Sequence, residues 1–293
     1  MAKRLYLPSD TNDPIVLADW LELVALTASD HNSSQADLER ELNRLGVEGA
    51  DSICSEAMTE LEMRISAAGQ GYPFTFSGTL LELRGKWQSY TPYVFCLLLS
   101  FCDDAQRKVT NVQHEVLFEK LCCIAAKEYI GGDVRRFGHP RDGVEMPAGF
   151  VEALKGLCRE VCEWSCSHVG RTHSAKDGGL DLVAWKPFPD RRIGKLILFG
   201  HCASGANWQD KIGELDPNAF CTQWLGGDRS PIVKSFFIPH LLRVDDFEKH
   251  ALRAHLFFDR CRIAYLVGNA ELPKDTGRDT VRWCENLLKR IGT

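Results

Sequence analysis

Two neighbouring apolar runs of the chain each carry a polar side chain that can bind a metal ion. Asp181 lies in the run LDLVAW (residues 180–185), and His201 directly follows the run KLILFG (residues 195–200). Both runs have the length and composition of β-strands, and a carboxylate is costly to bury in such a strand unless it is paired. The loop between them holds one acid, Asp190, and four cations: Lys186, Arg191, Arg192 and Lys195. This combination suggests a metal-dependent phosphodiesterase site.

The sequence also predicts the secondary structure around these two residues. Asp177-Gly178-Gly179 predicts a turn before the first strand, because glycine adopts backbone angles that other residues resist. A helix is predicted over residues 111–130, ended by Gly131-Gly132. Glu115 and Glu119 lie four residues apart and share one face of this helix. That face is either a solvated acidic surface or part of the site.

The run DGGLD (residues 177–181), the hairpin after it and Phe118-Glu119 on the helix before it together resemble the PD-(D/E)xK nuclease superfamily. The similarity is greatest to its Mrr-like restriction endonuclease branch and covers roughly residues 110–215. The resemblance implies an α/β fold with a restriction-endonuclease-like core, in which helices flank a central mixed β-sheet. It also implies that Glu119 and Asp181 bind Mg²⁺, with Glu115 as a substitute for Glu119.

The sequence departs from the family pattern at two positions. His201 stands where the family has Glu, Asp or Gln, and Ala203 stands where it has the lysine that orients the attacking water. Lys211, on the next predicted helix, is the first candidate for that lysine, ahead of Lys186 and Lys195. An imidazole suits Mn²⁺ better than Mg²⁺, so His201 is expected either as a third metal ligand or as a general base.

The resemblance therefore implies a metal-dependent endonuclease that hydrolyses DNA, most simply duplex DNA, in prokaryotic defence or restriction. Asp181, His201 and Lys211 are the expected catalytic residues, and Mg²⁺ or Mn²⁺ is the expected cofactor. The alternative is a catalytically impaired nuclease-fold subunit that binds nucleic acid or a partner protein of a defence system. His201 and Ala203 would then mark lost catalysis.

Basic residues in two segments are the expected contacts to the phosphate backbone. The first segment is the glycine- and proline-rich stretch 133–149, and the second is the loop within the hairpin. The expected nucleic-acid-binding residues are Arg135, Arg136, Arg141, Lys186, Arg191, Arg192 and Lys195. The net charge of −5 gives the whole molecule no attraction to nucleic acid, so binding must come from such local patches.

Other residues with chemical potential have simpler interpretations. Cys158, Cys162 and Cys166 recur every four residues on a helix predicted over 150–168, with His168 and His173 beyond it. Core packing is favoured over a zinc site there, because structural zinc usually takes ligand pairs across a turn. Cys202 adjoins His201, but successive strand residues point to opposite faces, which argues against a cysteine hydrolase.

Composition is that of an ordinary globular protein of one or two domains: 293 residues, 44% hydrophobic and 26% charged. The twelve cysteines, with no apparent export signal, predict reduced thiols and a cytoplasmic location. The apolar run at 93–101 is too short to span a bilayer. Asp259 and Arg260 are expected to form a structural ion pair.

Two domains are predicted. Residues 1–105 form a mostly helical N-terminal domain, with helices near 14–28, 35–45, 50–68 and 92–102 and short strands near 72–76 and 79–83. Residues 103–108 are the expected linker. Residues 106–293 form the nuclease-like domain, with an inserted segment at about 138–172 and further elements near 233–238, 245–255 and 280–291.

Overall fold

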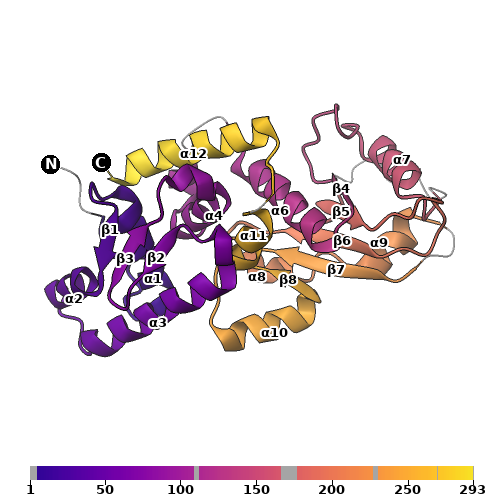
Figure 1. Ribbon diagram of the computed structural model, residues 1–293. Coiled ribbons are helices and arrows are strands. Elements are labelled where there is room, and N and C mark those ends of the chain that lie inside the picture. Colours follow the sequence, from indigo (N-terminus) through magenta and orange to yellow (C-terminus); the bar gives the residue numbers. More distant parts are fainter. Residues whose placement is uncertain (1–4, 109–111, 166–176, 227–229, 269, 293) are drawn as a thin grey trace. The chain divides into compact units, whose positions relative to one another are not determined.

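The protein is described by a computed structural model that covers residues 5–108, 112–165, 177–226, 230–268 and 270–292. The chain forms two compact units, and each draws on separate stretches of sequence (Figure 1). Unit 1 comprises Met1–His114, Pro239–Arg243 and Arg260–Thr293, and unit 2 comprises Glu115–Ile238 and Val244–Asp259. The division differs from the sequence-based one, because residues 260–293 belong with the N-terminal unit rather than with the nuclease-like region.

Unit 1 is largely helical and includes a small sheet. Its helices are α1 (Pro14–Thr27), α2 (Gln35–Arg44), α3 (Ala50–Ala68), α4 (Thr91–Phe101), α5 (Asp104–Arg107), α11 (Arg260–Val267) and α12 (Lys274–Gly292). The 3-10 turns η1 (Gly69–Gly71) and η2 (Trp87–Tyr90) complete the helical elements. The antiparallel sheet has the order β1-β3-β2, from β1 (Asn32–Ser34), β2 (Phe74–Phe76) and β3 (Leu80–Leu83).

Local sequence explains the helix boundaries in unit 1. Asp13 caps α1 by accepting a hydrogen bond from the Ile15 N–H, and Pro14 occupies the first helical position. Ser34 and Asp37 form a capping box at the start of α2. Asp103 begins α5 in the same way, so the segment expected to be a linker is a short capped helix instead.

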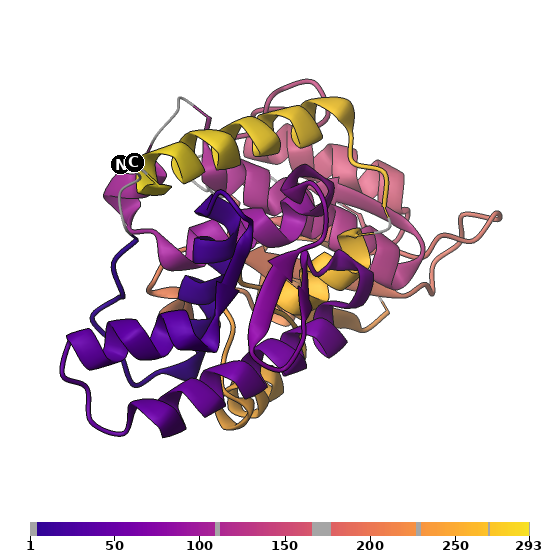
Figure 2. The same ribbon diagram turned by 60° about the vertical axis from the view of Figure 1, so that its left-hand side comes forward.

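The core of unit 1 joins its first and last segments. Helix α4 is buried along almost its whole length, and Trp283 of α12 packs edge-to-face on Phe95 with ring centroids 4.9 Å apart. The Trp283 indole also donates a hydrogen bond to the Arg107 carbonyl at 3.2 Å. Figure 2 shows α12 lying along this unit in yellow. The C-terminal helix is therefore an integral part of the first unit.

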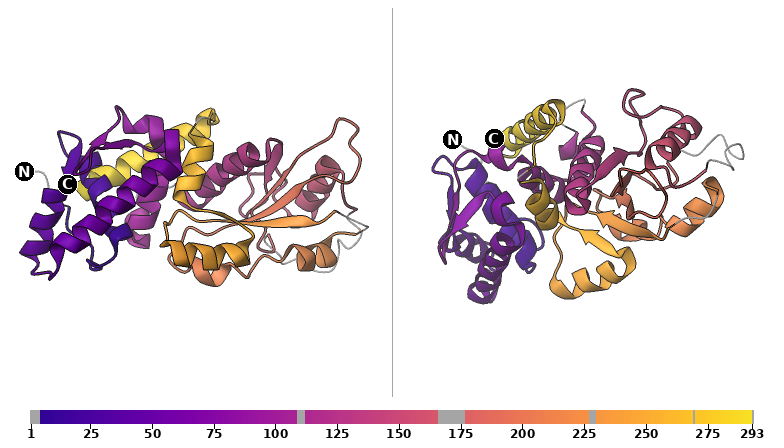
Figure 3. Two further views of the ribbon diagram at one scale, coloured as in Figure 1. Left: turned by 60° about the horizontal axis from the view of Figure 1, so that its bottom comes forward. Right: turned by 45° about the vertical axis from the view of Figure 1, so that its right-hand side comes forward.

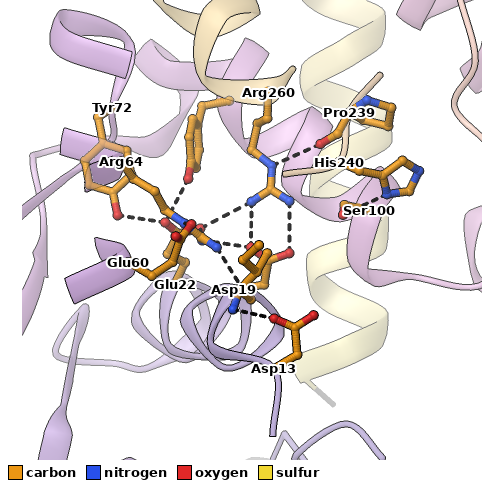
Figure 4. A network of polar contacts seen from close by, with 12 residues as sticks. Asp13, Asp19, Glu22, Glu60, Arg64, Tyr72, Ser100, Pro239, His240 and Arg260 are labelled. Atoms are coloured by element: carbon orange, nitrogen blue, oxygen red, sulfur yellow. Dashed lines mark hydrogen bonds and ion pairs between the residues drawn. The ribbon is translucent and has the colours of Figure 1, made fainter. Parts of the chain in front are cut away.

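A buried network of charged groups lies inside unit 1 (Figure 4). Arg260 binds both carboxylate oxygens of Asp19, at 2.7 and 2.9 Å, and Arg64 binds the same carboxylate at 2.8 Å. Arg64 also contacts Glu22 at 3.0 Å, and Glu22 accepts hydrogen bonds from Tyr72 and Tyr93. Arg260 thus has the structural role expected of it, but its ion-pair partner is Asp19 rather than Asp259.

Unit 2 is an α/β structure built on a five-stranded mixed sheet of order β4-β5-β6-β7-β8. The strands are β4 (Asp133–Arg136), β5 (Leu182–Trp185), β6 (Ile197–Cys202), β7 (Ile232–Phe237) and β8 (Leu256–Phe258). The first three are antiparallel, whereas β7 and β8 run parallel to β6. The helices are α6 (His114–Ile130), α7 (Phe150–Val161), α8 (Trp208–Lys211), α9 (Pro217–Trp224) and α10 (Val244–Ala254). The predicted α/β class with a central mixed sheet is confirmed.

Helices cover both faces of this sheet (Figure 3). On one face, Tyr129 of α6 packs on Phe258 of β8, with ring centroids 5.2 Å apart. On the other, Phe257 of the same strand meets Trp208 of α8 and Phe247 of α10. Because side chains alternate along a strand, His201 shares the α8 and α10 face, as does its neighbour Phe236 on β7.

The segment predicted to be an insertion contributes to the core of unit 2. Phe150, Leu154 and Leu157 of α7 are buried in a cluster with Phe199 of β6 and Trp224 of α9. This helix ends at Val161, seven residues before the predicted end, where Cys162 takes a left-handed conformation with φ 54°. Residues 133–136, expected to be part of a loop, form the edge strand β4.

The structure also bears on the expectations about cysteines and about membrane-spanning segments. Cys158 is disulfide-bonded, which differs from the expected reduced thiol. Cys158 lies in the core cluster, whereas Cys162 is only partly buried. Cys166, His168 and His173 lie outside the described residues. None of the helices formed by described residues combines the length and apolar character that a membrane crossing needs.

Candidate active site at the end of the β5–β6 hairpin

Asp181 lies immediately before β5, at the end of the strand that meets the turn 177–179. Its main chain continues the sheet, because its N–H donates to Gly200 and its carbonyl accepts from Phe137 and Gly138. Its side chain is also held, since Oδ2 accepts a hydrogen bond from the Cys202 N–H at 2.7 Å. The residue is only 6% exposed. The predicted carboxylate is therefore fixed at the strand end.

The carboxylates of Glu119, on α6, and of Asp181 both lie beside Gly138. A Cβ placed on residue 138 would lie 2.4 Å from Glu119 Oε2 and 3.1 Å from Asp181 Oδ1, so both carboxylates occupy the space beside this glycine. A larger residue at position 138 would require the Glu119 carboxylate to shift. The structure thus brings together the two carboxylates that the sequence analysis singled out, although Glu119 and Asp181 are 62 residues apart in the chain.

The charge of this pair is only partly balanced. Arg136 of β4 contacts Glu119 Oε2 at 2.7 Å, and both side chains are largely buried. Burial and the neighbouring charge of Asp181 nevertheless raise the pKa of Glu119 to about 8, against the lowering effect of Arg136. Excess negative charge of this kind, in a site that two carboxylates share, is what a divalent cation relieves.

His201 sits opposite Asp181 on the neighbouring strand. Its Nδ1 lies 2.9 Å from Asp181 Oδ2, and its ring is 6% exposed. Burial alone would lower the pKa of His201, but the contact with Asp181, the charge of Glu214 and the main chain of Gly179 raise it above its ordinary value. The imidazole is therefore stabilised in its charged form when no metal is present.

Glu214 is a site residue that sequence reasoning missed. Its Oε2 lies 3.5 Å from His201 Nε2, on the side of the ring away from Asp181. The Glu214 main chain lies beside Gly179, where an added Cβ would be in ordinary contact with the Glu214 carbonyl oxygen at 3.4 Å. Gly179 itself has φ 78°, a conformation that favours glycine at the end of the DGG turn. No spacing in the sequence signals this contact.

The expected lysines lie in different places. Lys211 ends α8, half-buried, three residues before Glu214, and forms no ion pair with a described residue. Lys195 is buried, and its ammonium group binds the Val161 and Cys162 carbonyls and Glu163. Lys186 donates to the Gly131 carbonyl. Lys186 and Lys195 lie at one end of the hairpin, and Asp181 and His201 lie at the other. The two ends are roughly 13 Å apart, because about four strand residues separate them.

The predicted phosphate-binding arginines do not form one surface. Arg136 is the partner of Glu119, and Arg141 is buried, donating to the carbonyls of Phe137, Pro147 and Ala148. Arg141 is therefore not exposed to a ligand, contrary to expectation. Arg135, exposed on the edge strand β4, pairs with Glu160 at 2.6 Å.

The loop of the hairpin is the exposed basic element. It projects from the sheet (Figure 2) and carries Arg192, whose side chain is 84% exposed and only 3.8 Å from Asp190. Arg191 is exposed too and reaches the Arg159 carbonyl and Cys162 Sγ. A cavity of about 330 Å³ lies beside this loop, lined by Arg135, Glu160, Trp185 and Phe188 among others.

Thiols next to the site do not supply a nucleophile. Burial and the neighbouring Cys122 thiol hold the pKa of Cys202 well above its usual range, and burial does the same for Cys123. Cys202 also points to the α6 face of the sheet, away from His201. This geometry agrees with the argument against a cysteine hydrolase.

The donor types at the site fit a divalent cation, with carboxylates from three segments and one imidazole. Among the described residues, however, no group of three or more His, Cys, Asp or Glu side chains is already arranged to hold a metal ion. Comparisons with protein-family models, curated proteins and solved structures gave no match.

Proposed function

We propose that the protein is a metal-dependent endonuclease that hydrolyses phosphodiester bonds in DNA. The observation that carries the proposal is the meeting of Glu119, Asp181 and His201 at one end of the β5–β6 hairpin. Helix, first strand and second strand supply these residues in the order expected from the PD-(D/E)xK resemblance. A mixed sheet with helices on both faces also agrees with a restriction-endonuclease-like core.

Glu119, Asp181 and His201 are the proposed residues for holding Mg²⁺ or Mn²⁺. When bound, such an ion polarises the scissile phosphate and lowers the pKa of a water molecule. The chain itself fixes Asp181 through the Cys202 N–H and orients His201 through the Asp181 carboxylate. Lys211, near the site on α8, is the remaining lysine that offsets negative charge on the phosphate.

Duplex DNA is the proposed substrate, with the basic loop as its phosphate contact. The loop that carries Arg191 and Arg192 extends beyond the sheet, at the end of the hairpin away from Asp181 and His201. One duplex would therefore have to pass along the hairpin to contact both the basic loop and the metal-binding residues. The family resemblance supports three further parts of the proposal. The protein acts in prokaryotic defence, is located in the cytoplasm and works with a partner protein of a defence system.

The second candidate is a catalytically impaired subunit that binds nucleic acid or a protein partner. The specific observation in its favour concerns lysine: Ala203 is buried where the family has a lysine, and Lys195 is committed to main-chain carbonyls elsewhere. Of the three lysines expected from the sequence, Lys211 remains, because Lys186 and Lys195 lie at the other end of the hairpin. The two candidates differ in whether Lys211 serves chemistry.

Incubation with supercoiled plasmid separates the two candidates. The full chain should nick plasmid with Mn²⁺ and lose the activity with a chelator, with Asp181→Asn and with Lys211→Ala. Lys127→Ala, an exposed lysine on α6, is the matched control and should retain activity. Binding of DNA by all variants without cleavage under any metal would reject the nuclease and favour the impaired subunit.

A further inference from the structure

We propose that His201 Nε2 and Glu214 Oε2 are neighbouring ligands of one transition-metal ion, and that Asp181 is a positioning residue acting on the imidazole from its other side. The inference rests on the metal dependence proposed above. It revises the ligand set proposed above: Glu214 joins His201 as a ligand, and the ion lies on the Nε2 side of His201, away from the Nδ1 contact with Asp181. Asp181 then acts chiefly through His201.

The first observation is a buried ring nitrogen that no hydrogen bond satisfies. His201 is 6% exposed, and neither of its ring nitrogens has a hydrogen-bond partner of good geometry among the described residues, although Nδ1 lies 2.9 Å from Asp181 Oδ2. Its nearest charged neighbour is Glu214 Oε2 at 3.5 Å, which lies beyond the usual hydrogen-bond distance. Buried polar atoms are almost always satisfied, so an unsatisfied one that faces a carboxylate suggests a ligand between them.

The second observation is the length of this separation. Two ligand atoms that each bind one ion at about 2.1 Å lie about 3.0 Å apart at the 90° angle of an octahedral ion such as Mn²⁺, and about 3.4 Å apart at a tetrahedral angle. The 3.5 Å between Nε2 and Oε2 lies close to the upper value. The same distance that is too long for a hydrogen bond therefore suits two ligands of one ion.

The third observation is the contact on the opposite side of the ring. Asp181 Oδ2 lies 2.9 Å from Nδ1 and is itself fixed by the Cys202 N–H. Histidines that bind metals almost always give their other ring nitrogen to a carboxylate or carbonyl, which sets the tautomer and the ring orientation. Asp181 provides this second contact and leaves Nε2 free to coordinate.

The main chain of Glu214 is fixed although its side chain is 53% exposed. Leu215 is buried in the core of unit 2, and Asp216 caps α9 by accepting from the Asn218 and Ala219 N–H groups. The Glu214 N–H donates to the Lys211 carbonyl at 3.0 Å. A fixed backbone with an accessible carboxylate gives a ligand that leaves positions on the ion open to water and to a phosphate.

The donor set also selects the metal. One imidazole nitrogen and one carboxylate suit Mn²⁺, Co²⁺ or Zn²⁺, whereas Mg²⁺ prefers oxygen ligands alone. A site of this kind would work with Mn²⁺ and poorly with Mg²⁺, and Glu214 would supply the carboxylate that the family resemblance places at position 201.

Manganese binding to the full-length protein, measured by calorimetry and pulsed EPR, tests the inference. The wild type should show one tight Mn²⁺ site with a nitrogen hyperfine coupling from a bound imidazole. Glu214→Gln should weaken Mn²⁺ binding at least tenfold and keep the nitrogen coupling, whereas His201→Gln should lose both. Asp210→Asn removes a nearby exposed charge on α8 and should bind Mn²⁺ like the wild type.

The outcomes distinguish this inference from the proposed function. Wild-type affinity in Glu214→Gln, or no nitrogen coupling in the wild type, would overturn the ligand assignment even if the protein cleaves DNA. The expected Mn²⁺ signature in a protein that never cleaves would leave the site standing and reject the nuclease. Circular dichroism of each variant confirms that the fold is retained.

Discussion

At the scale of single residues, Asp181 has a structural role and, in the proposed function, a chemical one. Its carboxylate accepts a hydrogen bond from the Cys202 N–H at 2.7 Å and contacts His201. An amide oxygen can accept the same hydrogen bond, but it carries no charge for a metal or an imidazolium. The two tasks can therefore be separated by substitution.

Asp181→Asn should abolish metal-dependent cleavage and leave the melting temperature within a few degrees of the wild type. Asp181→Ala should also be inactive and in addition lose about 1 kcal/mol of stability, because the Cys202 N–H loses its acceptor. Plasmid nicking and thermal unfolding of both variants provide the measurements. Unfolding of Asp181→Asn at room temperature would mean that the charge of Asp181 is needed for the fold itself.

Glu119 links the site to the pH dependence of stability. Its pKa is about 8 in the folded protein against an ordinary 4.5, so between these values the folded protein holds a proton that the unfolded chain has released. The unfolding free energy of the metal-free protein should therefore decrease as pH rises from 4.5 to about 8. The raised pKa of His201 acts in the same direction.

Glu119→Gln should reduce this loss of stability, since the amide does not titrate, and His201 should account for what remains. Urea unfolding in the presence of a chelator, at about pH 6 and about pH 9, measures the difference. Glu115→Gln, an exposed position one turn earlier, serves as the control. Equal pH dependence in Glu119→Gln and wild type would show that Glu119 is charged throughout this range.

At the scale of elements, the hairpin separates two kinds of basic residue that look alike in sequence. Arg191 and Arg192 extend from its loop, whereas Arg141 is enclosed by three main-chain carbonyls. Replacing Arg191 and Arg192 together by Ala should weaken binding to unrelated DNA duplexes about equally. It should also lower the salt slope by about one to two units.

Arg141→Ala should instead destabilise unit 2 by about 1–3 kcal/mol without changing the salt slope. Filter binding at several salt concentrations and thermal unfolding distinguish the two effects. A loss of binding confined to one DNA sequence in the Arg191 and Arg192 variant would mean that the loop reads bases. An unchanged melting temperature in Arg141→Ala would mean that its hydrogen bonds add little to stability.

Elements with strong local patterns were predictable. Helix α6 and strands β5 and β6 have regular apolar residues and turn signals at their ends, so these elements could be located from the sequence. Asp181 and His201 were noticeable as polar residues in or beside apolar runs, whereas Glu119 was singled out by the resemblance to the PD-(D/E)xK superfamily. Strand β4 could not be predicted, because DVRR is short, polar and half-exposed, and pairing with β5 creates it. Glu214 was missed because its contact with His201 is tertiary and has no local pattern.

At the scale of the whole molecule, the buried charges of unit 1 link segments from distant parts of the chain. Asp19 and Arg260 are separated by 241 positions, and no local pattern indicates such a pair. Burial alone would raise the pKa of Asp19, but the charges of Arg260 and Arg64 outweigh it and lower that pKa below its ordinary value. Each charge in the network therefore depends on its partners.

Arg260→Ala should destabilise unit 1 by about 3–5 kcal/mol, because it leaves Asp19 and Glu22 buried with only Arg64 to balance them. Arg278→Ala, which removes an exposed arginine of the same unit with acidic partners at 3.1 Å, should leave the unfolding free energy close to that of the wild type. Chemical denaturation compares the two variants. Similar losses in both would show that the buried network contributes no more than surface ion pairs.

The discontinuous make-up of unit 1 has a consequence for its synthesis. Arg260 and Trp283 leave the ribosome long after α1, and at roughly 5–20 residues per second the 241 positions between Asp19 and Arg260 take roughly 12–50 seconds. Until then, Arg64 is the one arginine of the network that can balance Asp19 and Glu22, and Phe95 lacks the indole that packs on it. The nascent N-terminal segment therefore stays incompletely packed during this interval, while the whole sequence of unit 2 is synthesised first.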